Sequence, residues 1–351
     1  MNTLRRFLRR LGAALAAHRD ALLLALAALA LGATFLHPSW PMERRELEFV
    51  AVFDITQSMN VQDVEQGGRP VSRLARARAA MAHALAALPC GSKAGWAIFT
   101  EYRSFLLLAP IEVCAHQREL LGELHRIDGR MAWAGNSEVA KGLNSGMLMV
   151  HGLPSRPALV FLTDGHEAPP VNPRYRPNFA LSRGDVRGLI LGVGSDAPRP
   201  IPKTDPSGRA LGEWRADEVL QVDPRSLGRG GSVAGEQMVE PDDVTVKPLP
   251  GAAPGSEHLS ALREGYLELL ASENGLAYRR LGDDRSVVAA LQDDRLAQAR
   301  PSSLDLRPAL GALALLALLA PVANAWRAQW QRRQAPTRPA ASPRHATRPQ
   351  G

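Results

Sequence analysis

A chain of 351 residues can hold one large domain or two ordinary ones. Its pI near 10.0 and formal net charge of +7 would suit a nucleic-acid partner, but residues 1–20 carry +4 and residues 307–351 carry +7, which leaves −4 for residues 21–306. The positive charge therefore lies in the two flanks, and a mildly acidic body argues against nucleic-acid binding by the folded part.

Each basic flank borders an apolar stretch. Residues 21–40 and 308–326 are each close to the ~20 residues that a membrane-spanning helix needs, and we predict a transmembrane helix at both. Arginine clusters precede the first and follow the second, so the positive-inside rule places residues 1–20 and the basic, disordered tail 327–351 in the cytoplasm. The alternatives are a cleaved signal peptide for the first stretch and a buried Ala/Leu helix for the second.

Between these stretches, Leu47–Phe53 form a nearly continuous apolar run that predicts a strand buried on both faces. Asp54, Thr56 and Ser58 follow it and present one carboxylate and two hydroxyls from a single turn. Ligands of open α/β sheets bind at the carboxyl ends of strands. An oxygen-only set suits Mg²⁺, Ca²⁺ or Mn²⁺. A helix N-cap is the alternative interpretation, since Thr and Ser favour that role too.

Strands and helices then alternate along the chain, which predicts a doubly wound α/β fold. Its sheet is mostly parallel, with one antiparallel edge strand and helices on both faces. The segment 195–256 interrupts the pattern as a long insertion, with possible hairpin arms at Ala210–Trp214 and Val219–Val222. The other predicted elements are helices at 71–88, 115–127, 138–150, 257–273 and 286–297, and strands at 94–100, 104–110, 158–163, 186–193 and 276–281.

The two cysteines flank the predicted hairpin formed by residues 94–100 and 104–110. Cys90 precedes the first arm and Cys114 follows the second, so an antiparallel pairing brings them together at the open end. An oxidising compartment outside the cytoplasm also favours a disulfide between them. Two free buried thiols are the alternative.

A second acid follows a second buried strand. Asp164 ends Ala158–Thr163 as Asp54 ends the first run, so adjacent parallel strands would direct both acids into one crevice. The alternative for Asp164-Gly165 is a simple turn. We interpret the next pair, His166-Glu167, as exposed polar residues that open a loop, with a general base as the less favoured function.

These residues resemble the metal-ion-dependent adhesion site of von Willebrand factor A (VWA) domains. The family pattern is Asp-x-Ser-x-Ser after the first strand, a Thr in a Gly-rich loop and an Asp in a Thr-Asp-Gly turn. Asp54, Thr56 and Ser58 match the first element, Ser137 in Gly135-Asn136-Ser137 takes the place of the Thr, and Asp164 matches the third. Both departures from the pattern retain a hydroxyl. The resemblance covers residues 46–296, within a domain that we delimit at 41–305.

The likeness is closest to bacterial membrane-anchored VWA proteins, including those of aerotolerance-type operons. It is carried by Ser58-Met59 through Asp63 to Arg73-Leu74, by Ile201-Pro202 through Trp214, and by Leu269–Tyr278. Phe53–Asp63 also resembles the VWA accessory proteins encoded beside methanol dehydrogenases. The resemblance implies a periplasmic domain anchored in the inner membrane, with a divalent cation (Mg²⁺ first, Ca²⁺ or Mn²⁺ as alternatives).

It further implies a protein partner that offers an acidic side chain to the cation, and a role in the assembly or maturation of an envelope enzyme. Other VWA proteins or operon-encoded maturation factors are candidate partners. Two other classes stay open: a metal-dependent hydrolase, and a membrane scaffold whose site is vestigial. The sequence contains no zinc motif, phosphate loop or nucleophile elbow, so we expect a binding protein and not an enzyme.

Overall fold

The computed structural model describes residues 18–171, 176–219, 238–239, 250 and 255–334. Contacts divide the chain into two compact units, residues 45–300 and residues 1–44 with 301–351. The first unit holds the predicted metal site, and each unit is described by itself.

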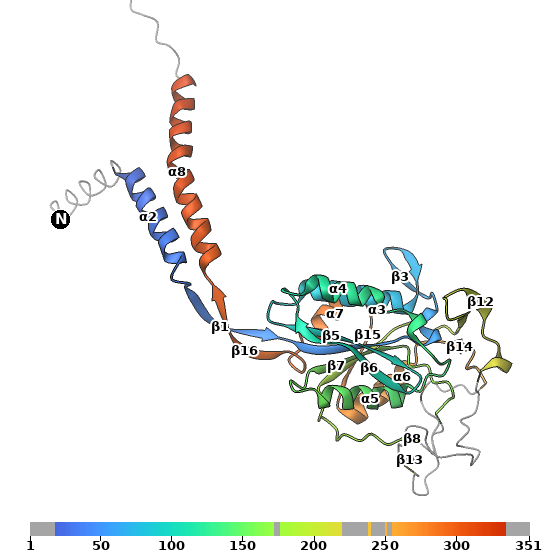
Figure 1. Ribbon diagram of the computed structural model, residues 1–351. Coiled ribbons are helices and arrows are strands. Elements are labelled where there is room, and N and C mark those ends of the chain that lie inside the picture. Colours follow the sequence, from blue (N-terminus) through green and yellow to red (C-terminus); the bar gives the residue numbers. More distant parts are fainter. Residues whose placement is uncertain (1–17, 172–175, 220–237, 240–249, 251–254, 335–351) are drawn as a thin grey trace, which may run out of the picture. The chain divides into compact units, whose positions relative to one another are not determined.

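Unit 45–300 is built on one six-stranded sheet with the order β15-β9-β7-β2-β5-β6 (Figure 1). Five strands are parallel, and β6 pairs antiparallel with β5 at one edge. The mostly parallel α/β sheet with an antiparallel edge strand is therefore confirmed. The strands are β2 (Glu48–Asp54), β5 (Lys93–Thr100), β6 (Arg103–Glu112), β7 (Ala158–Thr163), β9 (Gly188–Gly192) and β15 (Ala277–Arg280).

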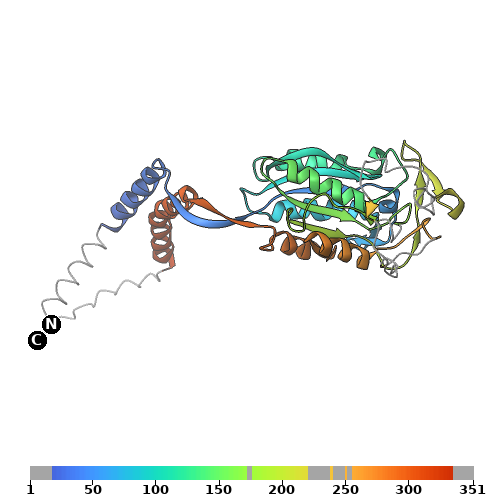
Figure 2. The same cartoon turned by 90° about the horizontal axis from the view of Figure 1, so that it is seen from below.

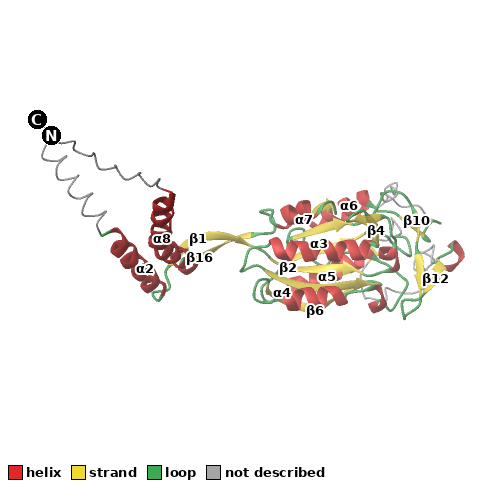
Figure 3. Ribbon diagram, turned by 90° about the horizontal axis from the view of Figure 1, so that it is seen from above, coloured by secondary structure: helices red, strands yellow, loops and turns green. Residues whose placement is uncertain are grey.

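Helices cover both faces of this sheet because its central strands bury side chains on both sides. Phe49, Ala51 and Phe53 of β2 point to one face, and Val50 and Val52 point to the other. The first face packs against α3, α4 and α7, which Figure 3 shows from above. The second packs against α5 and α6, and Figure 2 shows α5 in green. Their bounds are α3 (Arg73–Ala87), α4 (Gln117–Arg126), α5 (Val139–Gly152), α6 (Glu264–Asn274) and α7 (Asp284–Leu291).

The predicted start of α6 is wrong. The helix begins at Glu264 and not at residue 257, because Leu259–Ser260 form strand β14 and pair with β10 (Arg199–Pro200). Its end agrees with the prediction, since Gly275 follows Asn274 in the left-handed conformation with φ 73°.

The insertion contains short two-stranded sheets instead of the predicted hairpin. The partner of β12 (Ala210–Glu213) is β11 (Pro202–Thr204) and not residues 219–222, of which 220–222 lie outside the described residues. The remaining small elements are β3 (Val64–Gln66) with β4 (Arg69–Val71), β8 (Arg176–Pro177) with β13 (Met238–Val239), and the 3₁₀ turns η1 (Gln57–Asn60), η2 (Gly129–Met131) and η3 (Ala216–Glu218).

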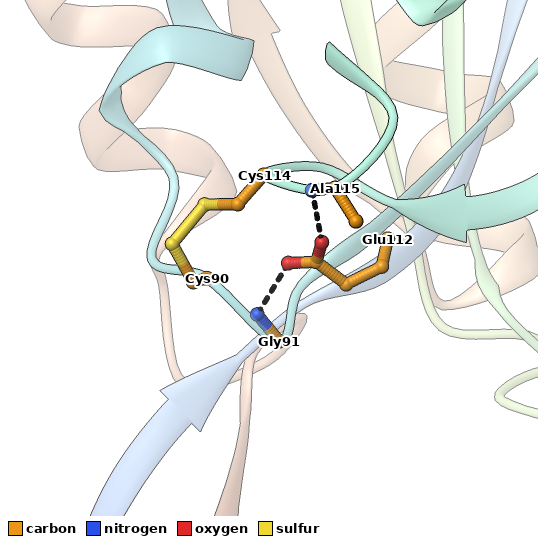
Figure 4. Close-up of a disulfide and its surroundings, with 5 residues drawn as sticks. All are labelled: Cys90, Gly91, Glu112, Cys114 and Ala115. Carbon is orange, nitrogen blue, oxygen red and sulfur yellow. Dashed lines mark hydrogen bonds between the residues drawn. A yellow bond between two sulfur atoms is a disulfide. The ribbon is translucent and has the colours of Figure 1, made fainter. Parts of the chain in front are cut away.

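A disulfide joins Cys90 and Cys114 across the β5–β6 hairpin, as the sequence predicts (Figure 4). The carboxylate of Glu112 lies beside it and accepts hydrogen bonds from the backbone N–H of Gly91 at 2.7 Å and of Ala115 at 2.5 Å. The group closes the end of the hairpin away from its Thr100–Arg103 turn.

The second unit contains the helices α2 (Arg19–Thr34) and α8 (Arg307–Gln334). Strand β1 (Ser39–Glu46) follows α2, strand β16 (Gln298–Asp305) precedes α8, and the two strands pair with each other. The two helices pack through Ala27 and Ala30 against Ala314 and Ala317. Among the described residues, one helix is long and apolar enough to cross a membrane, α8 over Arg307–Arg327. The described part of α2 has 16 residues, about 24 Å of helix against a hydrocarbon core of ~30 Å.

Candidate functional site

The predicted metal loop follows the central strand β2. Oδ1 of Asp54 accepts hydrogen bonds from the backbone N–H of Thr56 at 2.9 Å and from its hydroxyl at 2.7 Å. The Ser58 hydroxyl lies 3.3 Å from that of Thr56, and all three side chains are buried. Thr56 stands at the N-cap of η1, but its side chain makes no capping hydrogen bond. The side chains thus form an oxygen cluster and not a helix cap.

The other two predicted ligands come from loops at the same end of the sheet. Asp164 directly follows β7, which is parallel and adjacent to β2. Ser137 is held by its backbone, which exchanges two 2.8 Å hydrogen bonds with Ala168. The hydroxyl of Ser137 is buried and has no partner among the described residues. The structure therefore places Asp54 and Asp164 at neighbouring strand ends and leaves one hydroxyl available nearby.

A buried arginine that the sequence analysis did not assign to the site completes it. Arg73, the first residue of α3, is 0% exposed, and its Nη1 donates to Oδ2 of Asp164 at 2.5 Å. Its Nε and Nη2 bind both oxygens of Asp63 at 2.9 and 2.6 Å. Ser260 bridges the pair, since its hydroxyl lies 2.6 Å from Arg73 Nη1 and 2.8 Å from Asp164 Oδ2.

Asp54 and Asp164 differ in their pKa because, among the described residues, only Asp164 is paired with a positively charged side chain. Burial alone would raise the pKa of Asp164, but the charge of Arg73, together with the hydrogen bonds that Asp164 accepts, holds it below its usual range. Burial, and next the charge of Asp164, raise the pKa of Asp54 to about 7, against hydrogen bonds from Thr163 and Thr56. Arg73 thus pairs with Asp63 and Asp164, whereas the described residues give Asp54 hydrogen bonds from threonines and no basic partner.

The cluster suits a hard divalent cation. All its donors are oxygens, and a divalent ion would supply the positive charge that Asp54 lacks among the described residues. Octahedral Mg²⁺ places neighbouring ligands about 2.9 Å apart, from metal–oxygen distances of 2.0–2.1 Å. The 2.7 and 3.3 Å separations in the Asp54–Thr56–Ser58 cluster bracket that value.

The expectation that His166-Glu167 is an exposed pair is wrong. The two residues are 3% and 4% exposed and face different surroundings. His166 lines a cavity of about 250 Å³ together with Ser58 and Ser137. Burial lowers its pKa to about 4, so its imidazole is neutral at pH 7. Glu167 instead accepts a hydrogen bond from the Tyr266 hydroxyl at 2.7 Å, and burial raises its pKa to about 8.

Comparisons with known proteins report distant likeness only. No family model matches the chain, and no curated protein matches it. An aerotolerance-related membrane protein from Bacteroides fragilis superposes with a TM-score of 0.46 at 18% identity, covering 71% of this chain and 98% of that one. The PilB minor pilin from Streptococcus sanguinis gives a TM-score of 0.35 at 11% identity, covering 73% and 62%. An uncharacterized membrane-spanning protein from Vibrio fischeri gives 0.26 at 15%, covering 70% and 98%.

Proposed function

We propose that residues 45–300 are a VWA-type domain that holds one divalent cation and binds a protein partner through it. Asp54, Thr56, Ser58 and Ser137 would hold the ion, and Asp164 would flank it with its charge fixed by Arg73. The observation that carries the proposal is Asp54, a fully buried carboxylate set among hydroxyls that pairs with no basic side chain among the described residues. A resident cation would supply that missing positive charge and an open position for an acidic side chain of the partner.

Binding is favoured over turnover by the chemistry of the residues around the cluster. The hydroxyls of Thr56 and Ser58 are engaged within the cluster, and the pair His166-Glu167 is divided between two environments. Of the two, only His166 reaches the cavity. The arrangement can hold an ion and an incoming carboxylate, but it offers no nucleophile paired with a base.

We further propose that the domain is anchored in the inner membrane and faces the periplasm, with both ends of the chain in the cytoplasm. The apolar length of α8, the arginines beyond it and the disulfide support this location. A partner in that compartment would be an envelope protein. The resemblance of Phe53–Asp63 points to the maturation of a metal-dependent quinoprotein such as a methanol dehydrogenase.

Capture of partners by the full chain tests the binding function. Native membranes carrying the tagged protein are crosslinked in Mg²⁺ or in chelator, and the captured proteins are quantified by mass spectrometry. We expect a set of partners that is lost in chelator and in Asp54→Asn. The matched control is Asp294→Asn, since the Asp294 side chain is 72% exposed and pairs with Arg45. Equal capture in all four samples would refute the proposal.

A metal-dependent hydrolase is the second candidate, and one observation favours it. Nδ1 of His166 is buried without a partner among the described residues, and the residue lines the cavity beside the cluster. A neutral imidazole in that place can accept a proton from water. Hydrolysis of generic phosphoesters or peptides that requires Mg²⁺ and is lost in His166→Asn would establish this function.

A further inference from the structure

The cavity beside the metal loop is walled by the insertion. The β11–β12 hairpin and the turn that follows it contribute Ile201, Trp214, Glu218 and Val219 to its lining. The metal loop and the Ser137 loop contribute Gln57, Ser58, Asn136 and Ser137 to the same lining. Figure 3 shows β10 and β12 gathered at one end of the 45–300 unit.

Trp214 connects the hairpin to both loops of the site. Its indole N–H donates to Oε1 of Gln57, which lies between Thr56 and Ser58, at 2.7 Å. A Cβ placed on Gly135 would lie 3.9 Å from the indole ring. Lys203 covers the ring with its ammonium 4.4 Å from the centroid. The indole is thereby held in one orientation and, with the 4% exposed Ile201, gives the cavity an apolar wall.

The inner side of the cavity presents polar groups that lack partners. The hydroxyl of Ser137 and Nδ1 of His166 are both buried and unbonded among the described residues. Leaving buried polar atoms without partners is costly, so a ligand that enters the cavity is favoured if it brings hydrogen-bonding groups to these two positions.

Charge and size restrict the ligand further. None of the described residues lining the cavity is Lys or Arg; Glu218 is paired with Lys203 at 2.8 Å, and Glu257 accepts the N–H of Gly255. Among the described residues that line the cavity, a carboxylate would thus find no basic side chain, and the proposed cation would supply the positive charge. A volume of about 250 Å³ equals that of about eight waters and lies below the ~300–1,000 Å³ of cofactor and drug-sized sites. It fits amino-acid side chains.

We propose that this cavity recognises an extended peptide segment of a protein partner in which an acidic residue is flanked by an aliphatic one. The acid reaches the metal loop, a backbone amide group of the segment hydrogen-bonds with His166, and the aliphatic side chain packs on Trp214 and Ile201. The inference rests on the proposed function for the acid, and adds the insertion as the element that reads the neighbouring residue.

Three probe peptides test it on the detergent-solubilised full chain by isothermal titration in Mg²⁺. They are acetyl-Gly-Leu-Glu-Leu-Gly-amide, acetyl-Gly-Gly-Glu-Gly-Gly-amide and acetyl-Gly-Leu-Gln-Leu-Gly-amide. Burial of one leucine side chain predicts that the first binds about tenfold more tightly than the second. Trp214→Ala should bring the two within twofold, and Trp214→Phe should retain the difference. The control is Leu211→Ala on the same hairpin, where the side chain is exposed and outside the cavity lining.

Each outcome decides one claim. Equal binding of the two glutamate peptides, or no binding of either at millimolar concentration, overturns the inference. A tenfold preference that survives Trp214→Ala overturns it as well. The glutamine peptide and chelator report separately on the metal: if the glutamine peptide binds as well as its glutamate counterpart, or chelator has no effect, the proposed function fails instead.

Discussion

The substitution Asp54→Asn should make the metal-free protein more stable at alkaline pH. The introduced asparagine can accept the Thr56 N–H on its carbonyl oxygen. In the wild type the Thr163 hydroxyl donates to Oδ2 of Asp54 at 2.6 Å, and in the variant the amide group donates to that hydroxyl oxygen instead. Its side chain is isosteric with Asp, so the change removes the buried charge and reverses one hydrogen bond.

The magnitude follows from the pKa of Asp54, which burial, and then the charge of Asp164, raise from 3.8 to about 7. Folding favours the protonated carboxyl, so this group destabilises the folded state progressively as the pH rises from its unfolded pKa towards its folded one. At one pKa unit per 1.36 kcal/mol, the penalty is about 2 kcal/mol at pH 5 and about 4 kcal/mol at pH 8. The amide of the variant does not titrate. The difference in free energy of unfolding between variant and wild type should therefore increase by about 2–3 kcal/mol from pH 5 to pH 8.

Urea unfolding of the full chain in detergent and chelator, followed by near-ultraviolet circular dichroism at pH 5 and pH 8, measures the difference. Mg²⁺ at a hundred times its Kd should stabilise the wild type at pH 8 by about 2.7 kcal/mol, which offsets most of the penalty. The same addition should leave the free energy of unfolding of Asp54→Asn unchanged. If the difference in free energy of unfolding between the wild type and the variant is the same at pH 5 and pH 8, then Asp54 does not carry an uncompensated charge in the folded protein.

Three further variants and one control test the rest of the structure by urea unfolding. Replacing Cys90 and Cys114 with Ser opens a loop of sequence separation 24 and should lower the free energy of unfolding by about 3 kcal/mol; no loss under oxidising conditions would contradict the disulfide. Arg73→Met leaves its carboxylate partners buried without a cation and should destabilise by about 3–5 kcal/mol, whereas a loss below 1 kcal/mol would contradict the network. Gly142→Ala places a Cβ 2.1 Å from a phenylalanine ring on β5 and should cost about 1–3 kcal/mol, while the control Gly152→Ala, with nothing within 4 Å, should cost nothing.

The sheet and its helices were predictable because their side chains follow simple periods. The runs of β2 and β7 are buried on both faces, and an acid after each run indicated where the two strand ends meet. The hairpin and its disulfide followed from the same pattern. These features depend on residues close together in the sequence.

The parts that the sequence did not predict depend on distant pairings. Arg73 looks like an ordinary first-turn residue of a helix, and only the fold brings Asp63, Asp164 and Ser260 around it. The hairpin predicted in the insertion was wrong because residues 202–204 carry a proline and a lysine instead of an alternating apolar pattern. In α6, tertiary pairing of Leu259–Ser260 with β10 overrode a local helical pattern.

The stoichiometry of Mn²⁺ binding tests the central claim most directly. Titration of Mn²⁺ into the full chain in detergent, followed by the electron paramagnetic resonance signal of the free ion, counts the ions bound. The account predicts one tightly bound ion per chain that Mg²⁺ displaces and that Asp54→Asn abolishes. A wild-type titration in which all added Mn²⁺ stays free would contradict it and leave a membrane scaffold with a vestigial site.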